Sequence, residues 1–405
     1  VFAARWVPRR GWGKWGWAAL LVWLFAGTVW VHPHYLAYFN ELAGGPLGGQ
    51  RYLVDSNLDW GQSFVALREA LDERNIDTLR LSYYTYADPA HYGIRYEPIA
   101  PARGAPATLP ARFNPAPGVY VIGATPLQGV MVADPSTYDW FRHRPPDARP
   151  GFALFFYDVE EPQQPPTWLA QCTVPVVPLP PDAIAEGFGR DDLRLATFDC
   201  TQSWLFPTGG AEAGWYALFR DTAQSDSPFV QSHLVLARLS FEQTRSGALP
   251  PFAIYEAGGV PVPAHAFTET VAVGELRLLG YTLASSRVRA GETVEVWTYW
   301  RVEGLLQRLP SLMLHLIGAD GVPLAVGDGL GVPVESWRVG DVFVQRHALA
   351  VPAGAPVGEA TLVTGAYWLD SLERWAVHVG GEVGGDQFVL GTITFPEASS
   401  ELPGR

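Results

Sequence analysis

The stretch YLVDSNLDWGQSFVALREALDERNIDTLRLSYY, residues 52–84, decides the fold of the first part of this chain. Its short apolar start at 52–54 predicts a strand, and residues 60–74 then repeat apolar side chains at the spacing of an amphipathic helix. A second strand is expected over 79–84. Because strand and helix alternate, the stretch predicts a small α/β domain with a mainly parallel sheet.

The same alternation continues downstream and completes a domain over residues 40–160. After a loop rich in proline and alanine, a strand is expected over 119–123, a short helix over 135–143 and a final strand over 153–159. The chain then becomes so rich in proline, from 162 to 181, that neither a helix nor a sheet interior is expected there. We predict a linker in that segment.

Short strands dominate the rest of the chain. They are expected at 195–199, 215–219, 234–241 and 252–255 in a β-rich middle region, and at 275–281, 293–301, 311–318, 341–349, 359–368 and 386–394 beyond it. Repeated short strands separated by turns predict a C-terminal antiparallel β-sandwich over 266–397, after the linker and β-rich region at 161–265. The predicted fold class is therefore α+β and multidomain.

An apolar segment lies near the N-terminus. Residues 15–39 contain no Asp, Glu, Lys or Arg and predict one transmembrane helix, long enough to span at about 1.5 Å per residue. The basic residues before it are Arg5, Arg9, Arg10 and Lys14. They predict a cytoplasmic tail over 1–14 and an extracytoplasmic bulk in a single-pass cell-membrane protein. The alternatives are a cleaved signal peptide, against which the bulky residues at 29–31 argue, and a buried helix of a soluble domain.

The composition of the 405 residues bounds the classes of function. Hydrophobic residues make up 48% and charged residues 17%, which is typical of packed domains and not of a disordered chain. The net charge of −13 argues against nucleic acid as a partner, since a phosphate backbone is bound through a basic surface. The chain begins with Val1 and not Met, and we expect it to be the tail of a longer polypeptide.

Polar and aromatic side chains gather around the ends of the predicted strands. The substrate-binding candidates are Asp55, Asn57, Asp59, Trp60, Gln62, Tyr84, Tyr86, Thr125 and Gln128. Ligands of open α/β sheets bind beyond the carboxyl ends of the strands, and Asp55 follows the strand predicted at 52–54. Carboxylates and amides hydrogen-bond to sugar hydroxyls and an aromatic ring stacks on a sugar face, so these residues predict a site for a glycan or a lipid-linked sugar. The alternative is that Asp59 or Asn57 only caps the following helix.

Cys172 and Cys200 are the only cysteines. In an oxidising compartment they are expected to form a disulfide, since two cysteines without a histidine cluster make a poor metal site. His32 and His34 bracket a proline and are assigned to a solvated helix end, with a metal site as the alternative, and His315 is expected to pack within a strand. No hydrolase, nucleotide-binding or metalloprotease motif occurs in its proper context, so no catalytic residue, metal or cofactor is predicted.

The sequence HPHYLAYFNELAGGPLGGQRYLVDSNLDWGQ, residues 32–62, resembles a known pattern. It is similar to the region after the last membrane helices in bacterial relatives of the dolichyl-phosphate-mannose protein mannosyltransferases, a branch of the GT-C glycosyltransferases. Residues 79–98 and 118–146 continue the likeness, and residues 278–302 resemble a β-sandwich module appended to such enzymes. The resemblance implies a membrane enzyme that transfers a sugar from a polyprenyl-phosphate carrier to an acceptor on the outer face.

The chain also departs from this family. The family has many membrane helices and a catalytic acidic residue in an early extracytoplasmic loop, whereas one helix is predicted here, so no catalytic residue is carried over. The expected function is that of the outward-facing C-terminal part of a membrane glycosyltransferase, which supports glycan or acceptor binding and is not catalytic alone. Its expected partners are the membrane, a lipid-linked sugar or glycan acceptor, and the missing N-terminal membrane part of the longer chain. The alternative is a free-standing, membrane-anchored surface protein whose β-sandwich binds a glycan or a protein.

Overall fold

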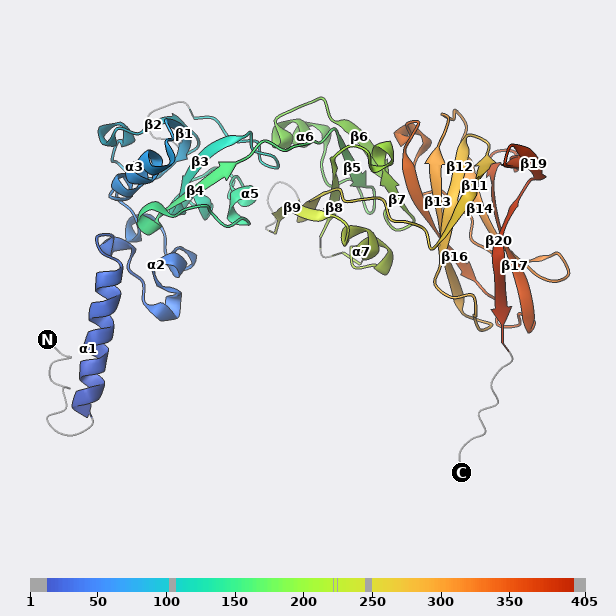
Figure 1. Cartoon of the computed structure of the whole chain (residues 1–405), viewed down its shortest axis with the longest axis horizontal. Coiled ribbons are helices and arrows are strands. Elements are labelled where there is room, and N and C mark those ends of the chain that lie inside the picture. The colour runs from blue at the N-terminus through green and yellow to red at the C-terminus, as the bar shows by residue number, and fades with distance from the viewer. Residues whose placement is uncertain (1–12, 102–106, 221, 224, 245–249, 397–405) are drawn as a thin grey trace. The chain divides into compact units, whose positions relative to one another are not determined.

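The structure is a computed structural model that describes residues 13–101, 107–220, 222–223, 225–244 and 250–396 (Figure 1). Its chain forms two compact units. Residues 1–162 and 185–189 belong to the first unit, and residues 163–184 and 190–405 belong to the second. Sheets with parallel strands and purely antiparallel sheets both occur, so the predicted α+β, multidomain class is confirmed.

The first unit begins with helix α1, Gly13–Trp30 (Figure 1). Most of its apolar side chains are exposed, and Gly27 is its only buried residue. Among the described residues, no helix combines the length and the apolar character needed to cross a membrane. The spanning helix predicted over 15–39 is therefore not confirmed, because α1 ends earlier and its tryptophans, glycines and Lys14 lower its mean hydropathy. Arg5, Arg9 and Arg10 lie outside the described residues.

Short helical turns connect α1 to the sheet of the first unit. They are η2 Tyr35–Ala37, η3 Glu41–Ala43, α2 Gly45–Gly48, η4 Gly49–Arg51 and η5 Asp55–Asn57. The strand predicted over 52–54 is wrong, because this segment lies between two such turns and Tyr52 and Leu53 are exposed. Gly44 and Gly45 adopt positive φ, which lets the chain turn sharply here.

A four-stranded sheet forms the centre of the first unit. Its strands are β1 Thr78–Ser82, β2 Arg95–Pro98, β3 Gly118–Gly123 and β4 Leu154–Val159, in the order β2-β1-β3-β4. β1 runs parallel to β2 and β3, and β4 is antiparallel to β3, so the expected parallel pairing is present. The sequence does not predict β2, because this strand is short and none of its residues is fully buried.

Helices cover both faces of this sheet. α3, Ser63–Arg74, buries Phe64 and Leu67 in a core with β1, β3 and β4. Alternate residues of β3 and β4 enter a second core, to which α4, Ala124–Leu127, and α5, Asp139–Arg142, contribute apolar side chains. The turns η6 Pro89–Tyr92 and η7 Pro150–Phe152 complete the elements of this region.

A five-stranded mixed sheet opens the second unit. Its strands are β5 Trp168–Cys172, β6 Arg194–Phe198, β8 Gly214–Phe219, β9 Arg238–Gln243 and β10 Phe252–Glu256, in the order β6-β5-β8-β10-β9. Helix α6 Pro181–Phe188 follows β5 in sequence, and α7 Pro228–Leu234 follows β8. β5 lies inside the predicted linker, yet every residue of it is buried. The linker prediction fails here because the prolines flank the strand, and residues 167–174 contain none.

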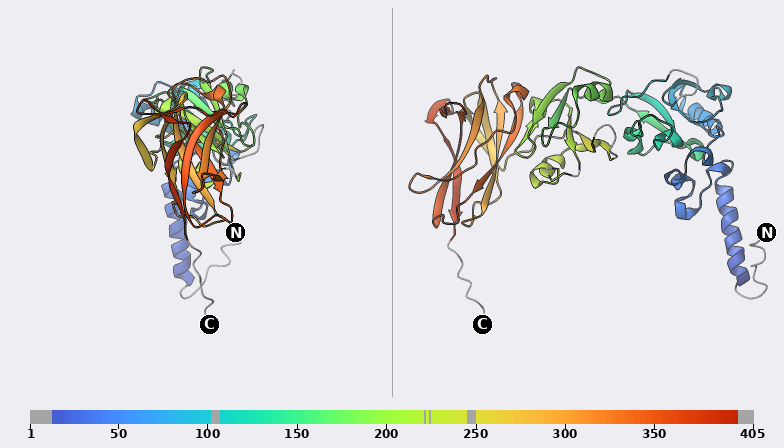
Figure 2. Two further views of the ribbon diagram at one scale, coloured as in Figure 1. Left: turned by 90° about the vertical axis from the view of Figure 1, so that its right-hand side faces the viewer. Right: turned by 180° about the vertical axis from the view of Figure 1, so that it is seen from behind.

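Two antiparallel sheets form the rest of the second unit (Figure 2), and we call this pair the sandwich. The larger sheet contains β7 Ser203–Phe206, β11 His265–Val273, β12 Leu276–Leu283, β13 Thr293–Val302, β16 Val342–Ala350, β18 Val377–Val379 and β19 Glu382–Gly385. The smaller sheet contains β14 Pro310–Ile317, β15 Pro323–Val326, β17 Gly358–Trp368 and β20 Phe388–Phe395. The turns η8 Pro207–Gly210 and η9 Val334–Ser336 lie between strands, and both sheets contribute to one apolar core.

One strand joins the two parts of the second unit. β7 belongs in sequence to the middle region, but it pairs with β16 at the edge of the larger sandwich sheet. The core is also continuous, because Trp168 and Tyr216 of the five-stranded sheet lie in the same buried cluster as Trp300 of β13. Cys172 and Cys200 belong to that cluster and are joined with an Sγ–Sγ distance of 2.08 Å, so the predicted disulfide is confirmed.

Candidate functional site

Two segments of the first unit bring part of the predicted sugar site together. The backbone N–H of Asp55 donates to Thr125 Oγ1 at 2.8 Å. Thr125 is buried in α4, directly after β3, while Asp55 is exposed and begins η5. The two candidates therefore meet beyond the carboxyl end of β3, although Asp55 does not itself follow a strand.

Asp59 is used to begin α3. Its Oδ1 accepts from the backbone N–H groups of Gly61 at 3.0 Å and Ser63 at 3.3 Å. Burial raises the pKa of this carboxyl above its usual value, while those hydrogen bonds and the nearby His34 oppose the rise. Asp59 therefore fixes the turn that leads into α3, although the N-cap residue of this helix is Gln62.

The most accessible part of the site is aromatic. Trp60 is 56% exposed and Tyr86 is 78% exposed, and their loops touch at Gly61 and Ala87. A Cβ at Gly61, which has a φ of 104°, would lie 2.3 Å from the Ala87 Cβ, so this close approach needs glycine. Tyr84, in the second loop, is half-buried. We call Trp60, Tyr86 and the two loops that carry them the aromatic loops.

The remaining candidates shape the loop or line another site. Gln62 accepts from the Trp60 N–H at 2.8 Å and donates to the Leu58 carbonyl at 3.0 Å, so it fixes the turn before α3. Asn57 donates to a carbonyl of its own turn at 3.1 Å. Gln128 lines a cavity that none of the other candidates lines.

That cavity was not expected from the sequence, and we call it the arginine cleft. It has a volume of about 490 Å³ and is lined by Arg51, Arg142, Arg144 and Arg149, together with Gln50 and Gln128. No aspartate or glutamate is among the described residues that line it. The feature of the sequence that could have indicated this cleft is the run RHRPPDAR at 142–149 in an otherwise acidic chain. Arg51, however, lies far from this run in the sequence.

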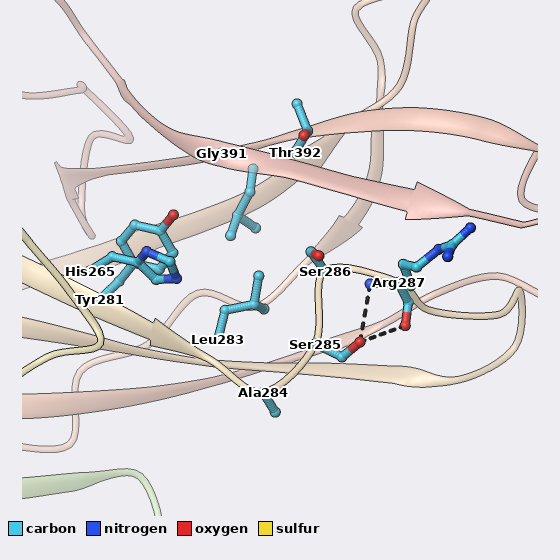
Figure 3. A pocket seen from close by; sticks show the side chains of 10 residues that line it. His265, Tyr281, Leu283, Ala284, Ser285, Ser286, Arg287, Gly391 and Thr392 are labelled. Carbon is cyan, nitrogen blue, oxygen red and sulfur yellow. Dashed lines mark hydrogen bonds between the residues drawn. The ribbon is translucent and has the colours of Figure 1, made fainter.

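The sandwich has a second cavity, of about 470 Å³, lined by residues of β11, β12, β17 and β20 and of the turn after β12 (Figure 3). The rings of His265 and Tyr281 stack there with their centroids 4.6 Å apart. Ser285 Oγ donates to the Arg287 carbonyl at 2.8 Å and accepts from the Arg287 N–H at 3.1 Å, which fixes the turn (Figure 3). Aromatic rings beside hydroxyl and guanidinium groups form a surface that suits a polar ligand.

The histidines of the chain do not form a metal centre among the described residues. No group of three or more His, Cys, Asp or Glu side chains in this part of the chain could hold a metal ion. His32 Nδ1 lies 2.7 Å from the Tyr35 hydroxyl, and His34 contacts Phe152 edge-on. His315 hydrogen-bonds to a carboxylate of the sandwich.

Comparisons with known proteins show only partial likeness to solved structures. No model of a known protein family matches the chain, and no curated protein matches it. The C-terminal domain of Wzt is similar at 13% identity and a TM-score of 0.25, over 35% of this chain and 92% of that one. The sporulation control protein Spo0M from Bacillus subtilis is similar at 14% identity and a TM-score of 0.20, over 31% of this chain and 51% of that one. Such low scores carry no argument about function.

Proposed function

We propose that this chain is the outward-facing, non-catalytic part of a membrane glycosyltransferase, and that its aromatic loops bind a glycan or a lipid-linked sugar. The observation that carries the proposal is the exposure of Trp60 and Tyr86 on two loops that touch. Large aromatic side chains are mostly buried in folded proteins, so two accessible rings on adjoining loops are informative. A sugar ring would offer its CH groups to an aromatic face and its hydroxyls to polar side chains such as Asp55, which is also exposed.

The membrane part of the proposal rests on α1. Trp15 is 78% exposed, Val22 67% and Phe25 71%. Burial of apolar surface stabilises by about 25 cal/mol per Å², so an apolar environment is favourable for this helix. Tryptophans near both of its ends suit the interfacial layers of a bilayer. Within the proposal, α1 holds the first unit beside the outer face of the membrane.

Calorimetric titration of the full chain in detergent, with short glycans and with polyprenyl-phosphate sugars, tests the sugar site. Trp60→Ala and Tyr86→Ala should each weaken binding by roughly two- to tenfold, since an aromatic contact contributes about 0.5–1.5 kcal/mol beyond its buried area. Val65→Ala, at another exposed apolar position of the same unit, is the matched control and should bind as the wild type does. Equal affinity in all three variants, or no binding by the wild type, contradicts the proposal.

Protease added to intact cells tests the orientation. Residues after 40 should be digested, while a tag at the N-terminus should be protected until the membrane is lysed. This expectation rests on the basic sequence before α1, which favours a cytoplasmic N-terminus. Protection of the second unit in intact cells would show the opposite orientation.

A second candidate function is ligand binding by the sandwich of a free-standing surface protein. The stacked rings of His265 and Tyr281 in the 470 Å³ cavity favour it. In the same titration, Arg287→Ala and Thr392→Ala should then weaken glycan binding, while Trp60→Ala should leave it unchanged. The first candidate predicts the reverse, so one set of variants separates the two.

A further inference from the structure

We propose that the arginine cleft of the first unit binds a phosphate group, carried either by an anionic lipid or by a soluble phosphorylated molecule. Four arginines line this cavity, three from residues 142–149 and one, Arg51, from a distant part of the sequence, and no aspartate or glutamate is among its described lining residues. Guanidinium groups match the several oxygens of a phosphate with paired N–H donors. The proposal stands independently of sugar binding at the aromatic loops.

Two of the arginines have no carboxylate partner in the part of the chain that the structure describes. Among the described residues, neither Arg51 nor Arg149 forms an ion pair; Arg149 donates to the Leu47 carbonyl and lies 4.5 Å from the centre of the Phe155 ring. Burial lowers the pKa of Arg149, and the positive charge of Arg51 lowers it further, against an opposing effect of Tyr157. A dianion between the two guanidinium groups would remove this repulsion.

The other two arginines are held in place by the protein. Arg142 pairs with Asp139 and donates to the Leu127 carbonyl at 2.8 Å. Arg144 lies 3.6 Å from the centre of the Trp140 ring and donates to the Trp140 carbonyl at 2.8 Å. Side chains fixed in this way lose little conformational freedom when a ligand binds.

Gln50 and Tyr157 add uncharged hydrogen-bond donors to the lining of the cleft. Gln50 is only 7% exposed, and its Oε1 has no hydrogen-bond partner in the part of the chain that the structure describes. This oxygen only accepts hydrogen bonds, so it would not contact an anion. The amide nitrogen of Gln50 is the donor that an anion requires. Tyr157 adds another, because burial raises the pKa of its hydroxyl and keeps it protonated.

The position of the cleft explains why a lipid is one source of the phosphate. Leu47, whose carbonyl accepts from Arg149, lies in α2. Gly45 of the same short helix lies against the ring of Trp30, the last residue of the exposed apolar helix α1. The cleft and the end of α1 are thus joined by a few residues. The net charge of −13 argues against an extended polyanion as the ligand.

Binding measurements on the full chain in an uncharged detergent test the site. Inorganic phosphate and diphosphate serve as soluble probes in calorimetric titrations, with chloride at matched ionic strength as the reference. For the lipid source, flotation compares phosphatidylcholine vesicles with vesicles that also contain phosphatidic acid. Arg51→Gln and Arg149→Gln should each weaken binding by roughly ten- to a hundredfold, since a hydrogen bond to a charged group is lost.

Arg95→Gln is the matched control. It removes the same charge from an exposed pair with Asp77 in the same unit, and it should bind phosphate as the wild type does. Arg51→Gln should keep the wild-type melting temperature, because Arg51 forms no ion pair with any residue that the structure describes. A loss of binding in this variant would then not be a loss of folding. Preference for soluble phosphate or for phosphatidic acid vesicles identifies the source. The absence of saturable binding to both, or equal weakening by Arg95→Gln, overturns the proposal.

Discussion

Arg194 of the second unit and two arginines of the arginine cleft, Arg51 and Arg149, are used in opposite ways. Arg194 of β6 is paired with Asp341, which is fully buried, whereas Arg51 and Arg149 have no carboxylate partner among the described residues. Removal of one partner of a buried ion pair leaves an uncompensated charge and is strongly destabilising, whereas like charges that lie close together repel each other unless a ligand offsets them. Mutations in the second unit should therefore change the free energy of unfolding, and mutations in the cleft should change affinity.

The largest effect is expected at Asp341. Its carboxylate accepts from Arg194, from the Thr208 N–H at 2.9 Å and from the Arg338 N–H at 2.8 Å. Asp341→Ala leaves the guanidinium of Arg194 without a counter-charge and should lower the free energy of unfolding of the second unit by about 3–5 kcal/mol. Urea denaturation followed by tryptophan fluorescence measures this change.

Asp386→Ala is the control for that measurement. Asp386 pairs with Arg374 at 3.4 Å on the surface of the same unit, where solvent screens the charges. Its loss should cost less than about 1 kcal/mol. If Asp341→Ala lowers the free energy of unfolding by no more than Asp386→Ala does, the buried Arg194–Asp341 pair does not contribute to stability as we expect.

Reduction of the disulfide should have the next largest effect. Cys172 and Cys200 are separated by 28 positions, and a closed loop of this length stabilises by about 3–4 kcal/mol in the chain-entropy account. Thermal melts with and without reductant measure the loss, and Cys172→Ala should reproduce it. Phosphate binding by the first unit should not change. Free thiols in protein purified without reductant would contradict the pairing.

Acid should destabilise the second unit through two buried histidines. Burial lowers the pKa of His233 and of His347 to about 4, although each ring donates a hydrogen bond to a backbone carbonyl that opposes the shift. In the unfolded chain both should titrate at about 6.5. Each therefore takes up a proton on unfolding between about pH 6.5 and 4, so stability present above this window is lost as the pH falls through it.

The expected loss at about pH 5 is about 2 kcal/mol for each histidine. Urea denaturation at several pH values gives the slope of stability against pH. His347→Gln should reduce that slope by the contribution of one group, whatever it does to stability at neutral pH. A slope that does not change in this variant would show that folding does not lower the pKa of His347.

The smallest effect is expected where Asp55 and Thr125 meet. Thr125→Val removes the hydroxyl that accepts from the Asp55 N–H, and should lower the free energy of unfolding of the first unit by about 0.5–1.5 kcal/mol. Sugar affinity should also fall if the position of the Asp55 loop matters for binding. If the variant is less stable but binds sugar as the wild type does, the contact has only a structural role.

Regular patterns in the sequence predicted most of the strands, because their alternation follows directly from burial on one face. In β13, Val294, Val296 and Trp300 are buried while Glu295 and Trp297 are partly exposed, as the alternation predicts, but Tyr299 on the second face is also buried. β5 was missed because flanking prolines concealed a short buried strand, and the three apolar residues at 52–54 were too few to define a strand.

The sites were predicted less completely than the fold. The sequence places Asp55 after a strand predicted at 52–54 and Thr125 after the strand predicted at 119–123; the two residues are in contact, although residues 52–54 form no strand. The arginine cleft could not be found in this way. It forms because residues 142–149 lie close to Arg51 in the folded chain, and their spacing along the sequence does not predict that proximity. Gln128 lines the cleft because the chain turns through α4 after Thr125.

The pairing of β7 with β16 limits which segment of the chain could be transferred to another protein as a folded β-sandwich. A gene fusion that transferred only residues 266–397 would leave out β7 and expose the edge of β16 at Val342–Gln345. It would also remove Trp204 from the shared core. An exposed strand edge pairs readily with other chains, so the transferred segment would tend to aggregate. A transferred segment that keeps Ser203–Phe206 should therefore aggregate less than residues 266–397 alone.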